Sequence, residues 1–247
     1  MKPHILKRWC IPPKHSADFV AAMEDILDQY SLPSHSSEPL VCMDEQPVQL
    51  LKETRRPIPM GPGRPLRIDY EYERNGTASI FLFVDPHRGW RHVSARPRRT
   101  KLDWAWEIRE LLDTWYPGVP RVRLVMDNLN THKLASLYEA FPADEARALA
   151  RRLELHFTPK HGSWLNMAES ELAVLTRQCL GRRITDLPLL CREIAAWEHE
   201  RNAQGKGIHW TFTIQAARDR LAHLYPPVAD VTERFAPTAS GLSALAA

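Results

Sequence analysis

Hydrophobic residues recur along this 247-residue chain in two periods, one typical of strands and one typical of helices. Short apolar runs, in part alternating with polar residues, predict buried or half-buried strands. The turn at 85–89, which contains Pro86 and Gly89, joins two of these runs as a hairpin. We therefore predict strands over 40–44, 78–84, 90–94, 122–126 and 153–157, with acids at the ends of the first and the fourth.

Helical spacing of apolar residues predicts the elements between and after the strands. Ser16 is a suitable N-cap for the first helix, and Pro142 interrupts a longer helical segment. The predicted helices span 16–30, 102–115, 133–153, 167–180, 182–200 and 214–224. The order strand, hairpin, helix, strand, helix, strand, helix predicts an α/β fold, a sheet of mixed direction covered by helices.

Composition divides the chain into three parts and excludes several classes of protein. Residues 1–39 hold one helix and a linker, 40–225 form the α/β domain, and 226–247 are a loose tail rich in Ala, Pro and Ser. No apolar run is long enough for a membrane span, and the N-terminus lacks the apolar segment of a secretory signal. Four scattered cysteines without a CxxC pair predict a reduced, cytoplasmic chain with no disulfide framework and no zinc site.

The net charge of +3 does not by itself imply a nucleic-acid partner. Most of the basic residues are arginines, which suit bidentate contact with phosphate. High-GC coding also enriches arginine over lysine, so composition leaves DNA binding open.

Three acids lie at or just past the ends of predicted core elements: Asp44, Asp127 and Glu169. An acid that closes an apolar strand is costly to bury unless it meets a cation. Each acid also has a simpler interpretation. Asp favours turns after strands, and Glu169 stands at the capping-box distance from Asn166. Glu171 is a rival to Glu169, but it points to another side of the helix, so both cannot face one site.

Carboxylates of this kind suit Mg²⁺ or Mn²⁺. Three of them can hold two ions about 3.5–4 Å apart, one activating the attacking oxygen and the other stabilising the leaving oxygen. A site of that type transfers phosphoryl groups by positioning and charge stabilisation, without a covalent nucleophile from the protein.

The sequence around these acids resembles the DDE transposases of the bacterial IS630 family, relatives of Tc1/mariner. Three segments carry the resemblance, and it extends over about residues 10–225: Val41–Gln46, Val125–His132 and Pro159–Glu169. It implies an RNase H-like fold and Mg²⁺-dependent cleavage of transposon-end DNA, with strand transfer into TA sites of target DNA. It implies two ions held by Asp44, Asp127 and Glu169, which favours Glu169 over Glu171, and a homodimer bridging two terminal inverted repeats near the bacterial nucleoid.

Two departures from the family leave alternatives open. The separation of Asp127 and Glu169 is longer than usual, which fits an extension around 141–145. Residues 1–39 have room for one helix, not for the helix-turn-helix modules that usually begin these proteins. The chain could therefore be a catalytic half, a stand-alone nuclease of the same fold, or a catalytically silent remnant acting only as a DNA-binding or assembly module.

Further residues flank the predicted site. His132 and His161 lie in the two loops beside it and could contact the scissile phosphate or orient a ligand, as could Asn128, although loop histidines and asparagines are often only solvated or turn-forming. A basic run after the hairpin could neutralise DNA phosphates or be an ordinary solvated surface; it comprises Arg96, Arg98, Arg99 and Lys101.

Overall fold

The computed structural model describes residues 14–227. The first thirteen residues of the predicted lead-in, and nearly all of the tail predicted over 226–247, lie outside the described range. None of the helices that the structure describes is long and apolar enough to cross a membrane.

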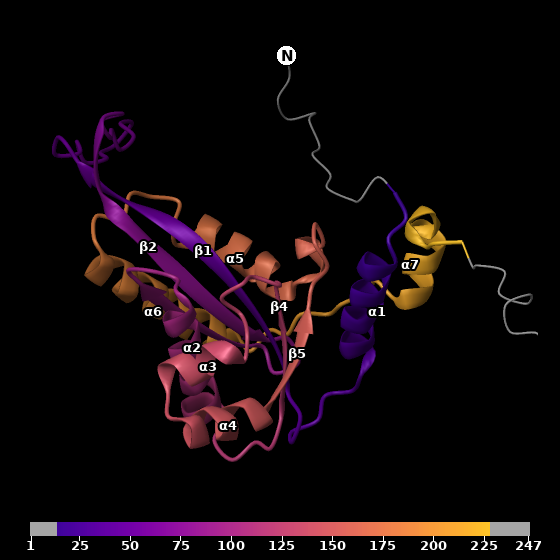
Figure 1. Cartoon of the computed structure of the whole chain (residues 1–247). Helices are drawn as coiled ribbons and strands as arrows, with labels where there is room; N and C mark the ends of the chain where they lie inside the picture. The colour runs from indigo at the N-terminus through magenta and orange to yellow at the C-terminus, as the bar shows by residue number, and fades with distance from the viewer. Residues whose placement is uncertain (1–13, 228–247) are drawn as a thin grey trace, which may run out of the picture.

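A five-stranded mixed sheet forms the centre of the molecule (Figure 1). Its strands lie in the order β3-β2-β1-β4-β5. The pairs β1–β2 and β2–β3 are antiparallel, whereas β1–β4 and β4–β5 are parallel. The strands are β1 (Leu40–Glu53), β2 (Tyr72–Asp85), β3 (Trp90–Arg96), β4 (Val122–Met126) and β5 (Leu153–Phe157). The predicted hairpin and the mixed direction of the sheet are confirmed.

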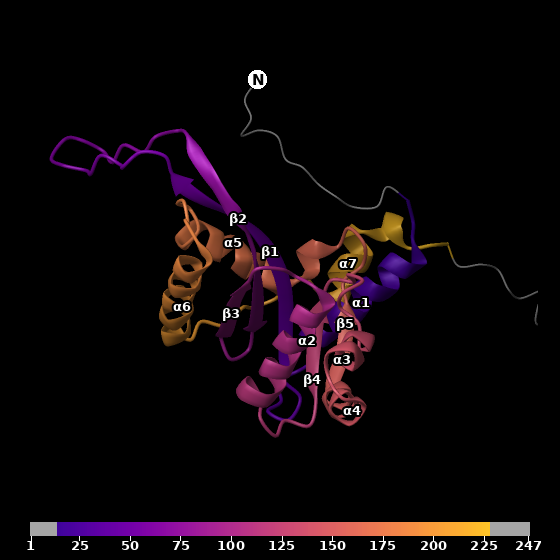
Figure 2. The same ribbon diagram turned by 60° about the vertical axis from the view of Figure 1, so that its left-hand side comes forward.

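Helices cover both faces of this sheet (Figures 1 and 2). One core cluster joins the sheet to α1 (Ala17–Ser31), α5 (Met167–Gln178), α6 (Leu187–Gln204) and α7 (Ile214–Arg220). The other joins it to α2 (Lys101–Glu110), a following π-helical turn (Leu111–Trp115), α3 (Ala135–Ala140) and α4 (Ala143–Arg151). Short 3-10 turns occur at Ser163–Leu165 and Ala222–Leu224.

The first strand is much longer than predicted, so the prediction that Asp44 ends it is wrong. β1 continues to Glu53 and pairs with β2 as far as Tyr72. Polar residues and Pro47 hid this extension in the sequence. Proline is tolerated here because pairing with β4 ends at Cys42, and a strand with one free edge can accept a missing N–H. Asp44 therefore lies inside a rigid strand.

Beyond the sheet, the β1–β2 hairpin projects as an arm, residues 54–71, seen at the upper left of Figure 1. The arm exposes large apolar side chains to solvent, the most exposed being Tyr70 at 85% and Met60 at 73%. It also carries four exposed arginines: Arg55, Arg56, Arg64 and Arg67.

The helices lie where the sequence predicts them, but several begin or end at other residues than predicted. Ser16 caps α1 by accepting a hydrogen bond from the Phe19 amide at 3.2 Å, as predicted. α6 begins at Leu187, not at 182, because the Asp186 side chain caps it through the Leu189 amide. It ends where Gly205 adopts a left-handed φ of 57°.

Candidate active site

Asp44 lies in β1, and Asp127 directly follows the end of the adjacent parallel strand β4. Cys42 of β1 pairs with Val125 of β4, and each acid follows two residues later. Side chains alternate between the faces of a strand, so Asp44 points to the same face as Cys42, which belongs to the core cluster that α5 shares. Asp127 follows the last residue of β4, and its charge is close enough to raise the pKa of Asp44.

Glu169 approaches the same edge from the first turn of α5. Buried Asn166 ties the start of that helix to β1. Its Nδ2 donates to the Met43 carbonyl oxygen at 2.8 Å, and its Oδ1 accepts from the Ala168 amide at 3.1 Å. One side chain thus links the residue before Asp44 to the helix that carries Glu169.

The predicted capping role of Asn166 is confirmed, but the reciprocal bond expected from Glu169 is not formed. The Asn166 amide donates to the Ser163 carbonyl oxygen at 2.8 Å instead. Glu169 is exposed at the helix start. Capping therefore does not account for this carboxylate.

Glu171, the rival carboxylate, is engaged elsewhere. Its side chain is only 5% exposed and accepts hydrogen bonds from Nε and Nη2 of Arg91 at 3.1 and 3.0 Å. Nη2 of Arg201 donates to both of its oxygens. Glu171 thus belongs to a buried ion cluster between β3, α5 and α6, and Glu169 is the helix carboxylate that is open to the site.

The electrostatics of Asp44 show that the three acids influence one another. Burial raises the pKa of Asp44 from 3.8 to about 6, and the charges of Asp127 and Glu169 raise it as well. A hydrogen bond of 2.8 Å from the Glu45 amide to Oδ1 works in the opposite direction. Ionisation of Asp44 is therefore disfavoured without a neighbouring positive charge.

His132 links Asp127 to Glu45. Its Nδ1 lies 2.7 Å from Oδ1 of Asp127 and 3.1 Å from the carbonyl oxygen of the same residue, and its Nε2 lies 2.9 Å from Oε1 of Glu45. The ring stacks on buried Trp104 at a centroid distance of 5.9 Å. Burial lowers the pKa of His132, but the bonds to Asp127 and Glu45 outweigh burial and raise it to about 9.

Glu45 is the site residue that sequence reasoning missed. Its side chain is 3% exposed, although it stands beside Asp44 in an apolar strand. A signal was available, because a second acid buried there requires a partner. What the sequence does not show is that His132, far along the chain, supplies that partner.

The donor set fits divalent cations, although it does not form one tight cluster. The oxygens of Asp44, Asp127 and Glu169 do not all lie within 4.8 Å of one another. A two-ion site does not need them to, since its outer ligands bind different ions. Carboxylate oxygens are the ligand type that Mg²⁺ and Mn²⁺ prefer, and the charges of Asp127 and Glu169 disfavour ionisation of Asp44 until a cation offsets them.

His161 and Asn128 lie on neighbouring loops. Both are exposed and line one surface pocket together with Lys160. His161 has a φ of 65°, a left-handed conformation uncommon outside glycine. The structure therefore brings these two predicted residues together in the loops that follow β4 and β5.

The basic run 96–101 is less free than its sequence suggests. Arg96 pairs with buried Glu107, and Lys101 pairs with Glu139. Arg99 lies 3.9 Å from Oε2 of Glu45, and Arg98 is exposed. Much of the positive charge of this run is thus neutralised within the molecule.

Comparison with models of known protein families identifies the family of this chain. The model of the DDE superfamily endonuclease family matches residues 39–191, more than half of the chain, so the chain belongs to this family. The match contains all three acids. No curated protein matches.

Solved structures of Mos1 mariner complexes have the same fold. The Mos1 paired end complex with Mn gives a TM-score of 0.54 at 15% identity, over 88% of this chain and 64% of that chain. The Mos1 strand transfer complex gives 0.53 at 15%, over 88% and 63%, and a pre-cleavage Mos1 transpososome gives 0.52 at 14%, over 91% and 67%. The chain thus spans less than two thirds of the first two proteins. The predicted RNase H-like fold is confirmed.

Proposed function

We propose that this chain is the catalytic domain of an IS630-type transposase, which cleaves DNA at the ends of its element and joins those ends to target DNA. One observation carries the proposal: Asp44 in β1, Asp127 just past the end of the adjacent strand β4 and Glu169 in the first turn of α5 are close enough for the last two charges to raise the pKa of Asp44. Membership of the DDE endonuclease family supports it. So do the solved Mos1 complexes, which include a paired end complex with Mn and a strand transfer complex.

The residues divide the chemistry as follows. Asp44, Asp127 and Glu169 would hold two Mg²⁺ or Mn²⁺ ions, which when bound supply activation of the attacking oxygen and stabilisation of the leaving oxygen. Because β1 continues past Asp44, its carboxylate is fixed by strand pairing on the β2 side. His132 holds Asp127 from one side and is itself held by Glu45.

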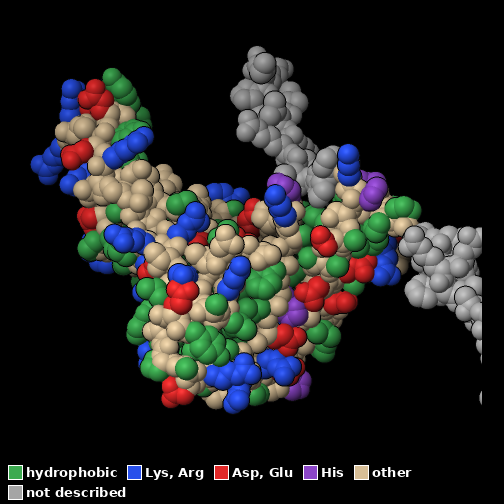
Figure 3. Space-filling view, in the orientation of Figure 1, with side chains coloured by type: hydrophobic (Ala, Val, Ile, Leu, Met, Phe, Trp, Pro, Cys, Tyr) green, Lys and Arg blue, Asp and Glu red, His purple; other side chains and the backbone are tan. Residues whose placement is uncertain are grey.

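The proposed partners are two terminal inverted repeats, a TA target and a second copy of the chain, in the bacterial cytoplasm. Basic side chains on the arm, visible in Figure 3, support contact with DNA phosphates. The exposed apolar residues of the arm support contact with a second chain.

The test is nicking of supercoiled plasmid by the purified chain with Mg²⁺ or Mn²⁺, followed by joining of a labelled 3′-OH oligonucleotide to the plasmid. Asp44→Asn, Asp127→Asn and Glu169→Gln should each abolish both reactions. Asp144→Asn is the matched control, because it removes an exposed carboxylate from the first turn of another helix, α4.

Three outcomes are informative. Full nicking by the Glu169→Gln protein would contradict the site assignment. Nicking without joining would identify a stand-alone nuclease. DNA binding with no metal-dependent cleavage by the unmodified chain would identify a silent remnant.

A further inference from the structure

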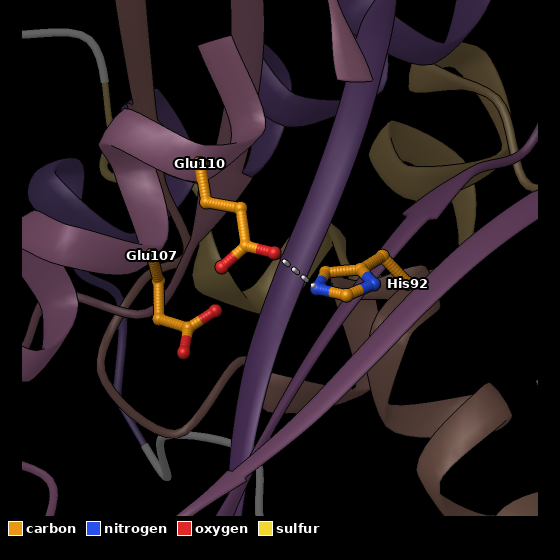
Figure 4. A group of neighbouring side chains, drawn as sticks. All are labelled: His92, Glu107 and Glu110. Atoms are coloured by element: carbon orange, nitrogen blue, oxygen red, sulfur yellow. Dashed lines mark ion pairs between the residues drawn. The ribbon is translucent and has the colours of Figure 1, made fainter. Parts of the chain in front are cut away.

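We propose a second cation site, formed by His92, Glu107 and Glu110, that binds a divalent transition-metal ion of the Zn²⁺ type. One ligand atom from each of these residues lies within 4.8 Å of the other two, and within residues 14–227 no other three such side chains meet this condition. Figure 4 shows the carboxylates of Glu107 and Glu110 turned toward the imidazole. The ligands come from β3 and α2, whereas the three acids of the candidate active site come from β1, the end of β4 and α5.

The fold fixes the spacing of these ligands. Glu107 and Glu110 are three positions apart on α2, so they lie on the same side of the helix. β3 is an edge strand of the sheet, and its His92 points toward Glu107 and Glu110 of α2 (Figure 4). Backbone geometry therefore brings the three side chains together.

Two buried ligand atoms lack a hydrogen-bond partner. They are Nε2 of His92 and Oε2 of Glu107, and the Glu107 side chain is fully buried. Buried polar atoms of this kind are normally satisfied, so each is an observation that requires an explanation. Nε2 also lies 3.7 Å from Oε1 of Glu110, which is too long for a hydrogen bond. A metal ion between the three groups would satisfy both atoms.

The remaining atoms of these residues hold them in position. Nδ1 of His92 lies 3.3 Å from Oε2 of Glu198, and this oxygen also accepts from the Val93 amide at 2.7 Å. Metal-binding histidines are commonly held in this way, with a carboxylate on the other ring nitrogen. Oε1 of Glu107 accepts from Oγ of Ser94 at 2.6 Å and from Nε of Arg96.

The charge at this location favours a cation. Three carboxylates, Glu107, Glu110 and Glu198, surround His92, and Arg96 pairs with one of them, Glu107. Burial lowers the pKa of His92, but these carboxylates raise it overall, so they favour a positive charge here, either a proton on the ring or a bound cation. An imidazole nitrogen with two carboxylate oxygens suits Zn²⁺. The Glu110 side chain is 40% exposed, so an ion and its water have access.

The competing occupant is a proton on Nε2 of His92, which would make this cluster an ion pair only. Calorimetric titration with Zn²⁺ at neutral pH distinguishes the two. It is done on the chelator-stripped full chain with Asp44→Asn and Asp127→Asn, so that binding at the candidate active site is suppressed. Co²⁺ absorption provides a second readout of the ligand set.

We expect one Zn²⁺ per chain in this background. Glu198→Gln should weaken binding by roughly 10–100-fold, as for other groups that orient a metal-binding histidine. His92→Gln and Glu110→Gln should weaken it further. His156→Gln should leave it unchanged, because His156 also lies between two carboxylates, Asp25 and Glu154, but outside this cluster.

Absence of Zn²⁺ binding in the background protein would overturn the proposal. So would a Zn²⁺ affinity in the His92→Gln and Glu110→Gln proteins equal to that of the background protein. Glu110 is partly exposed, so its variant tests the ligand even if loss of His92 disturbs the fold. The readout does not involve DNA cleavage, so this result is independent of the proposed transposase activity.

Discussion

Glu169 and Glu171 lie two positions apart on α5, and substitution by Gln should have opposite effects at the two positions. At Glu171 it should lower the stability and spare nicking, and at Glu169 it should abolish nicking and spare the stability. Glu171→Gln removes the charge that faces Arg91, whose side chain is 1% exposed, and Arg201. Four hydrogen bonds end on this carboxylate. Breaking a buried ion pair from one side costs about 3–5 kcal/mol, because it leaves an uncompensated buried charge. In a chain of this size that corresponds to a fall in Tm of roughly 6–20 °C.

Glu169→Gln should instead leave the free energy of unfolding within about 0.5 kcal/mol, because Glu169 is exposed and removal of its charge relieves repulsion with Asp44. Urea unfolding followed by circular dichroism measures both variants, and plasmid nicking supplies the activity. Glu171→Gln should retain metal-dependent nicking below its unfolding temperature, whereas Glu169→Gln should lose it. A Glu171→Gln protein as stable as the unmodified chain would refute the structural role of the ion cluster.

Three further predictions concern other parts of the molecule. The pKa of Asp44 is raised from 3.8 to about 6, so the folded state holds the proton more tightly than the unfolded state does. The free energy of unfolding without metal should therefore fall by on the order of 2–3 kcal/mol as pH rises from about 4 to about 6. Urea unfolding in EDTA should show a smaller fall for Asp44→Asn, and an equal fall in both proteins would contradict this. His132→Gln should raise the Mg²⁺ concentration for half-maximal nicking by roughly 10–100-fold, with little loss of maximal rate at saturating metal, because His132 holds Asp127 in position. An unchanged dependence of nicking on Mg²⁺ would exclude this role for His132. Gly89→Ala should destabilise the chain by more than about 2 kcal/mol in urea unfolding, because Gly89 has a φ of +64° and a Cβ there would lie 2.6 Å from the Gly205 backbone. Gly76→Ala is the control and should destabilise the chain less, because open space surrounds Gly76.

The sequence was sufficient for the fold because local patterns and global topology agree in most of it. The runs at 122–126 and 153–157 are apolar or alternating, and they are β4 and β5 with the predicted bounds. It was not sufficient for β1, where the pattern changes from buried to half-exposed at residue 44 while the strand continues. Periodicity detects the packing environment of a strand, and here that environment changes before the strand ends.

For the candidate site, the sequence identified the acids but not the contacts that position them. The proximity of Asp44 and Asp127 depends on the pairing of β1 with β4, which no local pattern contains. Likewise, Glu171 could be set aside only after its contacts with Arg91 and Arg201 were known. Such long-range ion pairs depend on the tertiary structure, so spacing along one helix cannot distinguish a ligand from a structural carboxylate.

The extension of β1 has a consequence for how the site is held. Because side chains alternate along a strand, Asp44 faces the α5 side, and the next residue, Glu45, faces the α2 side. His132 stacks on Trp104 of α2 and joins Glu45 to Asp127. Both core clusters therefore determine the position of the acids, one through α5 and the other through Trp104 and His132. Substitutions beneath α2 should then alter metal affinity even though they lie on the face of the sheet opposite to Glu169.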